Sequence, residues 1–313
     1  MTMYRIFLRP AMIFLPFVFG FCFPQAHILN DPPFHAVRWV LCIMVFLACL
    51  QLDLSQLKLR KEHFVISGIN IAMGVIPYFL LKFLIPSQPV LADAAFFTGI
   101  TPTATAAPVV VSFLNGRVGF ALTGFTVTNI AVSFSLLFLL PVVAGNFSFD
   151  FIRSVADTLF CVIGIPFFLA LLLRKIFPGV KSLPEKLKHF SFLLWSFMLF
   201  VMASIARTHF LEHPEEPFSQ VLLIGLISLV ICICNFSLGR IFSRKKFCRE
   251  SSQILGQKNT NLTLYLSLHY SGALTAMGPI FYVLWHNSWN AWQMYSADLR
   301  KLRRSKKRSL PRK

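Results

Sequence analysis

Charged residues are scarce in this chain, and acidic residues are the scarcest of them. Only 13% of the 313 residues are charged, and Asp and Glu together number 12. A soluble globular protein has about 25% charged residues, so this sequence cannot form a water-exposed surface of ordinary size. Disorder is excluded because it requires low hydrophobicity, whereas 56% of this chain is hydrophobic and its mean hydropathy is +0.67. The composition therefore indicates an integral membrane protein with many spans.

The sequence also lacks the short motifs of catalysis and of cofactor binding. It contains no Gly-x-Ser-x-Gly, no His-Glu-x-x-His and no phosphate-binding glycine loop. Its seven cysteines have no spacing that is typical of a disulfide framework or a zinc site. An intramembrane enzyme built on His269, His286 and a hydroxyl would need a base–nucleophile spacing that is absent. We therefore expect no enzyme activity and no cofactor.

Long apolar runs predict the fold class. A helix that crosses the ~30 Å hydrocarbon layer needs about 20 apolar residues. Runs of this kind, separated by turn-forming residues, predict an all-α membrane protein with ten transmembrane helices over residues 1–297. The expected segments are 8–29, 36–54, 64–86, 90–114, 118–143, 152–174, 189–207, 219–242, 251–270 and 273–296.

The distribution of Lys and Arg supports this count, because cytoplasmic loops carry an excess of both residues. With the N-terminus inside, 25 of the 30 Lys and Arg residues fall on the inner side and 4 on the outer side, and Lys258 lies within a span. An odd number of spans would break this alternation. We therefore expect both termini in the cytoplasm.

The tail 298–313 is strongly basic, with nine Lys or Arg residues and one Asp. We expect a cytoplasmic segment that binds anionic lipid, which attracts each basic residue by about 1 kcal/mol near the surface. A partner-binding or nucleic-acid-binding arm is the alternative. No aromatic residue lies among the charges to stack on bases, so nucleic acid is not expected as a partner.

Two of the ten segments should not form continuous helices. The fourth contains two prolines, Pro102 and Pro108, each of which removes an amide donor and clashes with the preceding turn. Three threonines line this break: Thr101, Thr103 and Thr105. The ninth contains six consecutive residues with hardly an apolar side chain: Gly256, Gln257, Lys258, Asn259, Thr260 and Asn261. Such backbone is tolerated at membrane depth only where it lines protein or a cavity.

The two breaks have matching positions along the chain. Thr105 precedes Gly116 by eleven residues, and Asn261 precedes Gly272 by eleven residues. One break lies in the fourth span of the first five and the other in the fourth span of the last five. This predicts two inverted repeats, about 8–143 and 152–296, because five is an odd number of spans. Paired broken helices in inverted repeats point to the central site of a transporter.

At these residues the sequence resembles the bile acid:sodium symporter family and related bacterial transporters. The stretch Gly256–Ser288 is similar to the ninth and tenth helices of that family, including a Phe-x-Val-x-x-His-Asn pattern that ends in His286 and Asn287. Thr101–Leu122 resembles the first crossover and the turn that follows it. Weaker similarity extends over spans two, three, six and eight.

The resemblance implies a panel domain of spans 1, 2, 6 and 7, and a core domain of spans 3–5 and 8–10 with crossing broken helices. It implies an organic anion as substrate and the inner membrane of a bacterium as location. The residues expected to bind substrate or ion are Thr101, Thr103, Thr105, Gln257, Lys258, Asn259, Thr260 and Asn261. His286, Asn287 and His269 are expected to support them, as helix–helix hydrogen bonds or as proton carriers.

The family's sodium ligands are replaced in this chain. The Glu-x-Gly-x-Gln-Asn pattern of its second crossover falls on Ile254, Gly256, Lys258 and Asn259. A Ser-Asn pair of the first crossover falls on Ala107–Pro108, and a Gln of the third span falls near Ala72. Hard cations require several oxygen ligands, so sodium coupling is doubtful and no metal site is expected.

Lys258 is the central candidate, since an ionisable side chain at membrane depth is by default a functional hypothesis. Its ammonium could take the place of a sodium ion as a tethered cation. It could instead lose its proton, because burial disfavours the charged form of a lysine, and thereby couple transport to protons. The third alternative is that it reaches the inner surface from a shifted helix.

The sequence thus predicts a secondary active transporter that moves an organic anion by alternating access. Facilitative or proton-coupled transport without sodium is the first alternative, and a non-transporting membrane scaffold is the second. The substrate and the oligomeric state are left open.

Overall fold

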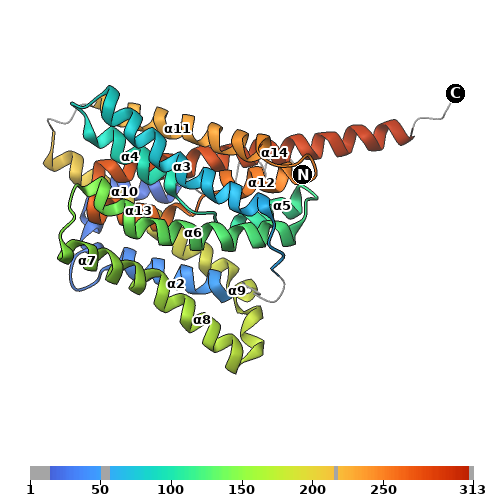
Figure 1. Cartoon of the computed structure of the whole chain (residues 1–313), viewed down its shortest axis with the longest axis horizontal. Coiled ribbons are helices and arrows are strands. Elements are labelled where there is room, and N and C mark those ends of the chain that lie inside the picture. Colours follow the sequence, from blue (N-terminus) through green and yellow to red (C-terminus); the bar gives the residue numbers. More distant parts are fainter. Residues whose placement is uncertain (1–14, 51–56, 215–217, 310–313) are drawn as a thin grey trace.

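The computed structural model describes residues 15–50, 57–214 and 218–309, which form an all-helical protein (Figure 1). Within these ranges, the one pair of residues in a β-bridge is Thr103 and Lys258. The structure therefore agrees with the predicted fold class.

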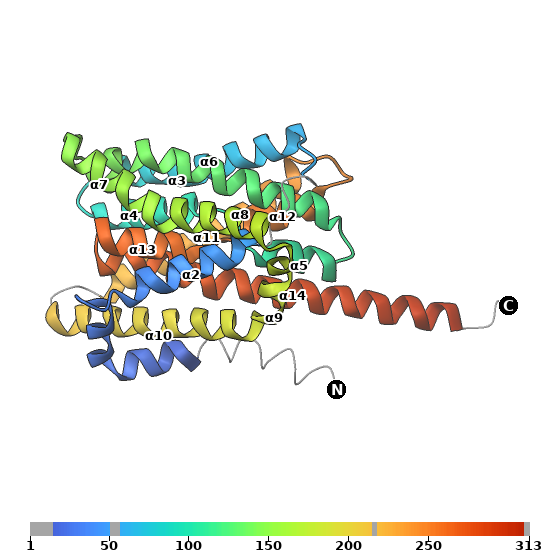
Figure 2. The same ribbon diagram turned by 90° about the horizontal axis from the view of Figure 1, so that it is seen from below.

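Most of the elements are helices that run side by side (Figure 2). Residues 15–22 are helical and precede the first of them. In chain order the elements are η1 (Pro24–Asn30), α2 (Ala36–Leu50), α3 (Lys61–Leu84), α4 (Pro89–Ile100), α5 (Ala106–Phe113), α6 (Val118–Ala144), α7 (Phe149–Leu159), η3 (Phe160–Gly164), α8 (Ile165–Ile176), η4 (Pro178–Ser182), α9 (Leu183–Lys186), α10 (Lys188–Glu212), α11 (Phe218–Ile241), α12 (Cys248–Gly256), α13 (Thr260–Tyr270) and α14 (Ala273–Ser309).

Five of the described helical segments are long and apolar enough to cross a membrane: Lys61–Leu84, Val118–Ala144, Phe149–Ile176, His189–Glu212 and Phe218–Ile241. The third of these passes through the π-helical turn η3. Two shorter apolar helices are Ala36–Leu50 and Pro89–Ile100. These segments are those of a multi-pass membrane protein, whereas the count of ten spans and the inverted repeats stay predictions.

Large apolar side chains cover the outside of the helices. Phe83 is 84% exposed and Phe134 is 64% exposed, and Phe138 and Phe168 are exposed to a similar degree. Soluble proteins rarely expose extended apolar patches. Many of the 35 phenylalanines therefore fit a surface that faces lipid.

The helices form two groups by their closest contacts, and the two groups share one apolar core. The pairs α3–α4, α11–α12, α11–α14, α4–α14 and α3–α6 are in close contact, whereas α2 packs mainly on α8 and α10. Figure 1 shows α2 and α8 along one side, away from α3, α4 and α11. The interrupted helices lie within the first group.

The expected first span is shorter than predicted in its described part. Its α-helix ends at Cys22, and the chain continues as the 3-10 segment η1, which packs on α10. Residues 8–14 of that expected span lie outside the described residues. Pro24 at the first turn of η1 has no amide to donate and fixes its own φ, which ends the α-helix here.

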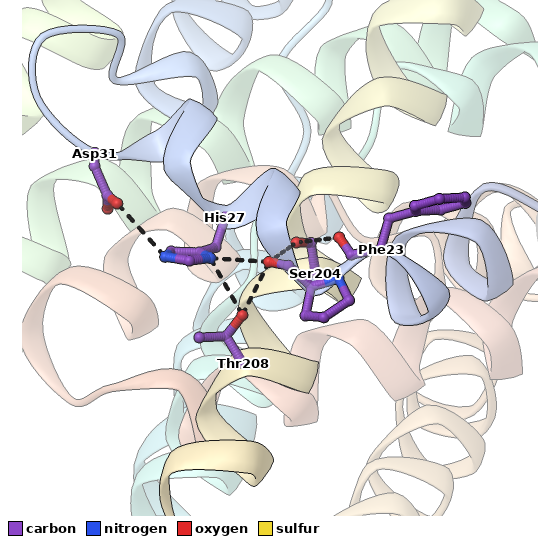
Figure 3. A network of polar contacts seen from close by, with 6 residues as sticks. Phe23, His27, Asp31, Ser204 and Thr208 are labelled. Carbon is purple, nitrogen blue, oxygen red and sulfur yellow. Dashed lines mark hydrogen bonds and ion pairs between the residues drawn. The ribbon is translucent and has the colours of Figure 1, made fainter.

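A polar network fastens η1 to α10 (Figure 3). Ser204 donates to the carbonyls of Phe23 and Pro24 at 2.9 and 2.7 Å, and Thr208 donates to the Pro24 carbonyl at 3.0 Å. His27 lies 2.8 Å from the same carbonyl and pairs with Asp31 at 3.8 Å. In this network a hydroxyl, an imidazole and a carboxylate follow one another, as they do in a catalytic triad. However, both hydroxyls donate to backbone carbonyls, so the network anchors the chain.

The tenth expected span ends later than predicted. Its helix α14 continues through the basic tail to Ser309, and its last part projects beyond the other helices (Figure 2). Residues 310–313 of the tail lie outside the described residues.

Candidate site at the crossing of two interrupted helices

The fourth expected span is interrupted where its prolines predict. Helix α4 ends at Ile100, and Thr101 has left the helical region with ψ near 129°. Pro102 explains this change, since the residue before a proline is pushed towards extended conformations. Pro108 lies in the first turn of α5, where an amide needs no intrahelical partner.

The ninth expected span is interrupted without any proline. Helix α12 ends at Gly256, the backbone of Gln257 is extended, and α13 begins at Thr260. The break coincides with the polar run that the sequence singles out.

The two interruptions meet and pair as short antiparallel strands. The amide of Ala104 donates to the carbonyl of Gln257 at 2.8 Å, and the amide of Asn259 donates to the carbonyl of Pro102 at 2.7 Å. Thr103 and Lys258 lie opposite each other in this bridge. The pairing satisfies backbone groups that have no helical partner, as unwound backbone at membrane depth requires. We call residues 101–105 and 257–259 the crossing.

Lys258 is buried inside the crossing. Its residue is 2% exposed, and its ammonium donates to the side-chain oxygen of Asn70 and, at 3.1 Å, to the carbonyl of Gly99. Among the described residues no carboxylate pairs with it. The side chain therefore does not reach the surface, and the third sequence hypothesis for Lys258 is wrong.

The carbonyl of Gly99 belongs to the last turn of α4. A helix C-terminus carries a partial negative charge and favours a nearby cation. The ammonium of Lys258 thus occupies a position where backbone carbonyls partly compensate its charge. The same helix end would suit a small metal cation.

Asn70 completes this arrangement, although the sequence analysis did not single it out. Its amide nitrogen donates to the carbonyls of Ile100 and Thr101, both at 3.1 Å, while its oxygen accepts from Lys258. It lies on α3, two residues from Ala72, where the resemblance placed a ligand. The sequence feature that could have identified Asn70 is that it is a lone amide side chain within an apolar span.

Two of the three expected threonines hold the crossing together. Thr103 donates to the carbonyl of Ile254 at 2.6 Å and accepts from Thr128 of α6 at 2.7 Å. Thr101 donates to the carbonyl of Phe97 and lies 2.7 Å from the hydroxyl of Thr263. Both hydroxyls are already hydrogen-bonded within the protein. Their evident role is to tie the breaks to the neighbouring helices.

The third threonine is placed differently. Thr105 is half-buried at the start of α5, and its side chain makes no capping hydrogen bond there. Asn259, at the corresponding position before α13, is also half-buried and provides no side-chain cap. Two helix N-termini without side-chain caps thus adjoin the crossing. Amides at a helix N-terminus favour anions.

The other polar residues of the second break point to different partners. Gln257 and Thr260 are buried, with 3% and 4% exposure, and Gln257 joins the crossing through its carbonyl. Asn261 extends its amide nitrogen towards the sulfur of Met44 on α2, at 3.4 Å. It is the one expected site residue for which the structure records a side-chain contact with the second group of helices.

The expected supporting residues separate into two places. His286 and Asn287 lie together on α14, with 3.2 Å between their side-chain nitrogens, and the ring of His286 lies near Tyr282. Tyr282 in turn donates to the carbonyl of Gly256 at 2.9 Å, next to the crossing. His269 is exposed in the last turn of α13, stacked on Tyr265. The structure does not bring it together with the crossing, because it lies at the far end of α13 from the break.

No metal centre of the usual kind is present in the part of the chain that the structure describes, where no group of three or more His, Cys, Asp and Glu side chains could hold an ion. The best oxygens for a hard cation are those of Asn70 and Gly99 at the end of α4, and both accept from the Lys258 ammonium. The donor set therefore fits a tethered cation better than a bound sodium ion.

Comparison with known proteins adds no family to this description. No family model matches the chain, and no curated protein is significantly similar to it.

Proposed function

We propose that this protein is a secondary transporter that carries a small organic anion by alternating access around the crossing. The observation that supports it best is a buried ammonium, with no carboxylate partner among the described residues, at the point where two interrupted helices meet. Paired broken helices are typical of the central site of transporters. The resemblance to the bile acid:sodium symporters, with two inverted repeats of five helices and a panel and a core domain, is part of the proposal.

The sign of the substrate follows from the electrostatics of the crossing. A buried charge is stabilised by a partner of opposite charge, and the described neighbours of Lys258 supply only neutral oxygens. The N-termini of α5 and α13 add partial positive charge. A carboxylate or sulfonate that enters here meets a positive site without a co-transported cation. Lys258 thus serves as the tethered replacement for sodium.

Relative movement of the two helix groups requires weak contacts between them. The link between Asn261 and Met44 is of this kind, because a thioether is a weak hydrogen-bond acceptor. An oxygen of the substrate would accept the same N–H more strongly. Asn261 is therefore the residue that we expect to exchange a contact with α2 for a contact with substrate.

The setting proposed for this transporter is the inner membrane of a bacterium, with both termini in the cytoplasm. The basic residues between Arg240 and Arg249, and those of the tail, then face anionic lipid on the cytoplasmic side. We infer no nucleic-acid partner and no resident cofactor.

The first experiment measures transport currents of the purified protein in liposomes on a solid-supported membrane. The probes are short-chain monocarboxylates, dicarboxylates, alkyl sulfonates and taurocholate, added one at a time. We expect a current with at least one anion for the wild type and for the control Lys82→Met, and its loss in Lys258→Met. Lys82 is a suitable control because it is exposed on α3.

Two results would contradict the proposal. A folded wild type that gives no current with any probe under any ion or pH gradient would favour a non-transporting scaffold. A Lys258→Met variant with unchanged current would remove Lys258 from the mechanism. A current that requires an imposed pH gradient would assign coupling to protons.

The second experiment tests sodium directly. The unfolding temperature in detergent is compared in sodium chloride and in an equal concentration of choline chloride. A ligand at 100 times its dissociation constant stabilises a protein by about 2.7 kcal/mol, which a thermal melt resolves. We expect no sodium-specific increase, and an increase would show that Lys258 does not replace the ion.

A further inference from the structure

A second buried polar cluster lies on α14, outside the crossing. Tyr282, His286, Asn290 and Gln293 follow one another at intervals of three or four residues, so they share one side of the helix. Tyr282, His286 and Asn290 are 0%, 6% and 3% exposed. Amphipathic helices in membranes turn such a polar stripe towards protein or water.

The neighbouring helices present further amides to this stripe. Asn235 of α11 donates to the hydroxyl of Tyr282 at 3.1 Å, and Gln253 of α12 donates to the oxygen of Gln293 at 2.6 Å. Asn235 and Gln253 are 0% and 1% exposed. The ring of Trp289 stacks on Phe236 of α11 and borders the same region. Three helices therefore enclose the cluster.

Many polar atoms of this cluster have no protein partner. Ten buried side-chain atoms of the described residues lack a hydrogen bond, and six of them belong to this cluster: Asn235 Oδ1, Gln253 Oε1, His286 Nδ1, Trp289 Nε1, and both Oδ1 and Nδ2 of Asn290. Buried polar groups in native proteins are nearly always bonded to protein or to ordered water. Their concentration between α11, α12 and α14 therefore indicates an occupant.

The chemistry of the six atoms identifies the occupant. They include donors (Trp289 Nε1 and Asn290 Nδ2) as well as acceptors (the amide oxygens), and no charged side chain. The titratable groups beside them are Tyr282, Cys232, which packs in the same buried cluster as Tyr282, and the imidazole of His286. A cation would leave the donors without partners, and an anion would leave the acceptors without partners. Water can bond to the donors and to the acceptors. At about three hydrogen bonds per buried water molecule, the six atoms could bind about two waters.

The cluster extends from the crossing to the loop that precedes α12. At one end Tyr282, which packs in one buried cluster with Cys232, donates to the carbonyl of Gly256, two residues before Lys258. At the other end the pair Gln253–Gln293 lies towards the loop before α12, which carries Arg244 and Lys245. We call this loop side the basic end of the bundle.

We propose that α11, α12 and α14 enclose a chamber of ordered water that exchanges with bulk water at the basic end and reaches the crossing at Tyr282. The chamber is separate from the substrate contacts at Asn261 and from the helix N-termini of the crossing. It brings water next to Gly256, two residues before Lys258. This inference does not depend on the transport proposal.

The test is radiolytic hydroxyl-radical footprinting of the full-length protein in detergent, since radicals form from bound water inside a protein. Trp289 and Trp285 provide a matched pair on the same helix. Both are half-buried, but the indole N–H of Trp285 donates to the carbonyl of Gly225 at 3.0 Å, whereas that of Trp289 has no partner. We expect Trp289 to be oxidised several-fold faster than Trp285. Rapid mixing with ¹⁸O-water before exposure should place ¹⁸O on Trp289.

Two variants test the assignment to the chamber. Asn290→Leu removes both of its unpartnered atoms and should reduce the oxidation of Trp289 several-fold. Thr275→Val removes an unpartnered hydroxyl from the first turn of α14, far along the same helix, and should leave that rate unchanged. If Asn290→Leu does not fold, the wild-type ratio of the two tryptophans and the ¹⁸O incorporation decide the matter.

Three results would overturn the inference. Equal oxidation of Trp289 and Trp285 would show that the region is dry. Absence of ¹⁸O on Trp289 would show that its water does not exchange with the bulk. A change in Trp289 oxidation when sodium and potassium are replaced by choline would show a cation among the amide oxygens.

Discussion

The contact between Lys258 and Asn70 makes a quantitative prediction about stability. Asn70 holds three groups at once, because its oxygen accepts from the ammonium and its nitrogen donates to two carbonyls of the crossing. Asn70→Leu removes all three interactions and leaves a buried ammonium with Gly99 alone. A hydrogen bond to a charged group contributes about 1.5–3 kcal/mol and a neutral one about 1 kcal/mol. We therefore expect Asn70→Leu to destabilise the protein by about 4 kcal/mol.

Lys258→Met should behave differently. It leaves two oxygens without a donor, at a cost of about 1–3 kcal/mol each, but it also removes the expense of a lysine at membrane depth, about 2.5–3.5 kcal/mol. The two effects nearly cancel at the lower end of the first range. We expect the stability of Lys258→Met to lie within about 1 kcal/mol of the wild type.

The double variant Asn70→Leu/Lys258→Met tests whether the two side chains stabilise each other or contribute independently. With the ammonium gone, Asn70→Leu loses only its two neutral hydrogen bonds, so the double variant should be about 2 kcal/mol less stable than the wild type. The loss of stability in the double variant is thus about 2 kcal/mol smaller than the sum of the two single losses. A coupling energy of this size is within the range found for residues in one network. Lys82→Met serves as the control, since its exposed ammonium donates to the hydroxyl of Tyr78 at 2.9 Å and not to Asn70.

The assay is thermal unfolding of all four proteins and the control in one detergent, with a reversible denaturant titration where the melt is irreversible. A change of 1 kcal/mol shifts the unfolding temperature by roughly 2–4 °C in a domain of 150–250 residues, so Asn70→Leu should unfold about 10 °C lower. Additive effects in the double variant would refute the reasoning. They would mean that the ammonium does not depend on Asn70.

Two further predictions concern the packing of the crossing, and both are measured by the same melts. Thr103→Val should destabilise the protein by about 2 kcal/mol, because two hydrogen bonds between helices are lost. Thr105→Val should change the free energy of unfolding by no more than about 0.5 kcal/mol. Equal effects of the two variants would contradict the different roles of these hydroxyls. Gly99→Ala should destabilise by about 3 kcal/mol, since its Cβ would overlap the carbonyl of Met73 where α4 crosses α3. The matched control is Gly68→Ala on α3, where the added Cβ meets nothing within 4 Å and should stabilise the helix by up to about 1 kcal/mol. A Gly99→Ala protein as stable as the wild type would disprove the close approach of α4 to α3.

The positions of both breaks could be predicted from sequence, because their causes are local. Pro102 forces the preceding residue out of the helix wherever the chain lies. The polar run around Lys258 cannot face lipid, so an interruption there needs no knowledge of the other helices. The membrane character of the long spans is predictable for the same reason.

The partners of these breaks were not predictable, since they depend on which helices cross. Nothing in the sequence near Asn70 indicates that it meets Lys258 rather than lipid or another amide. The position of His269 shows the opposite error. Nine residues separate it from Thr260 on α13, which at 1.5 Å per residue places it about 13 Å from the break, although both residues belong to one predicted span.

In the proposed transporter, the arrangement of charge at the crossing explains how a buried lysine is accommodated while a positive site is left for an anionic substrate. Its ammonium binds at the C-terminal end of α4, where carbonyl groups are in excess, and it is held there by Asn70. The N-termini of α5 and α13, where amide groups are in excess, adjoin the same bridge without side-chain caps. Had the ammonium of Lys258 pointed towards those N-termini, positive groups would oppose one another there. Its actual position neutralises the negative end of one half-helix and leaves the positive ends of two others to an anion, so the order of residues at the second break matters as much as the presence of the charge.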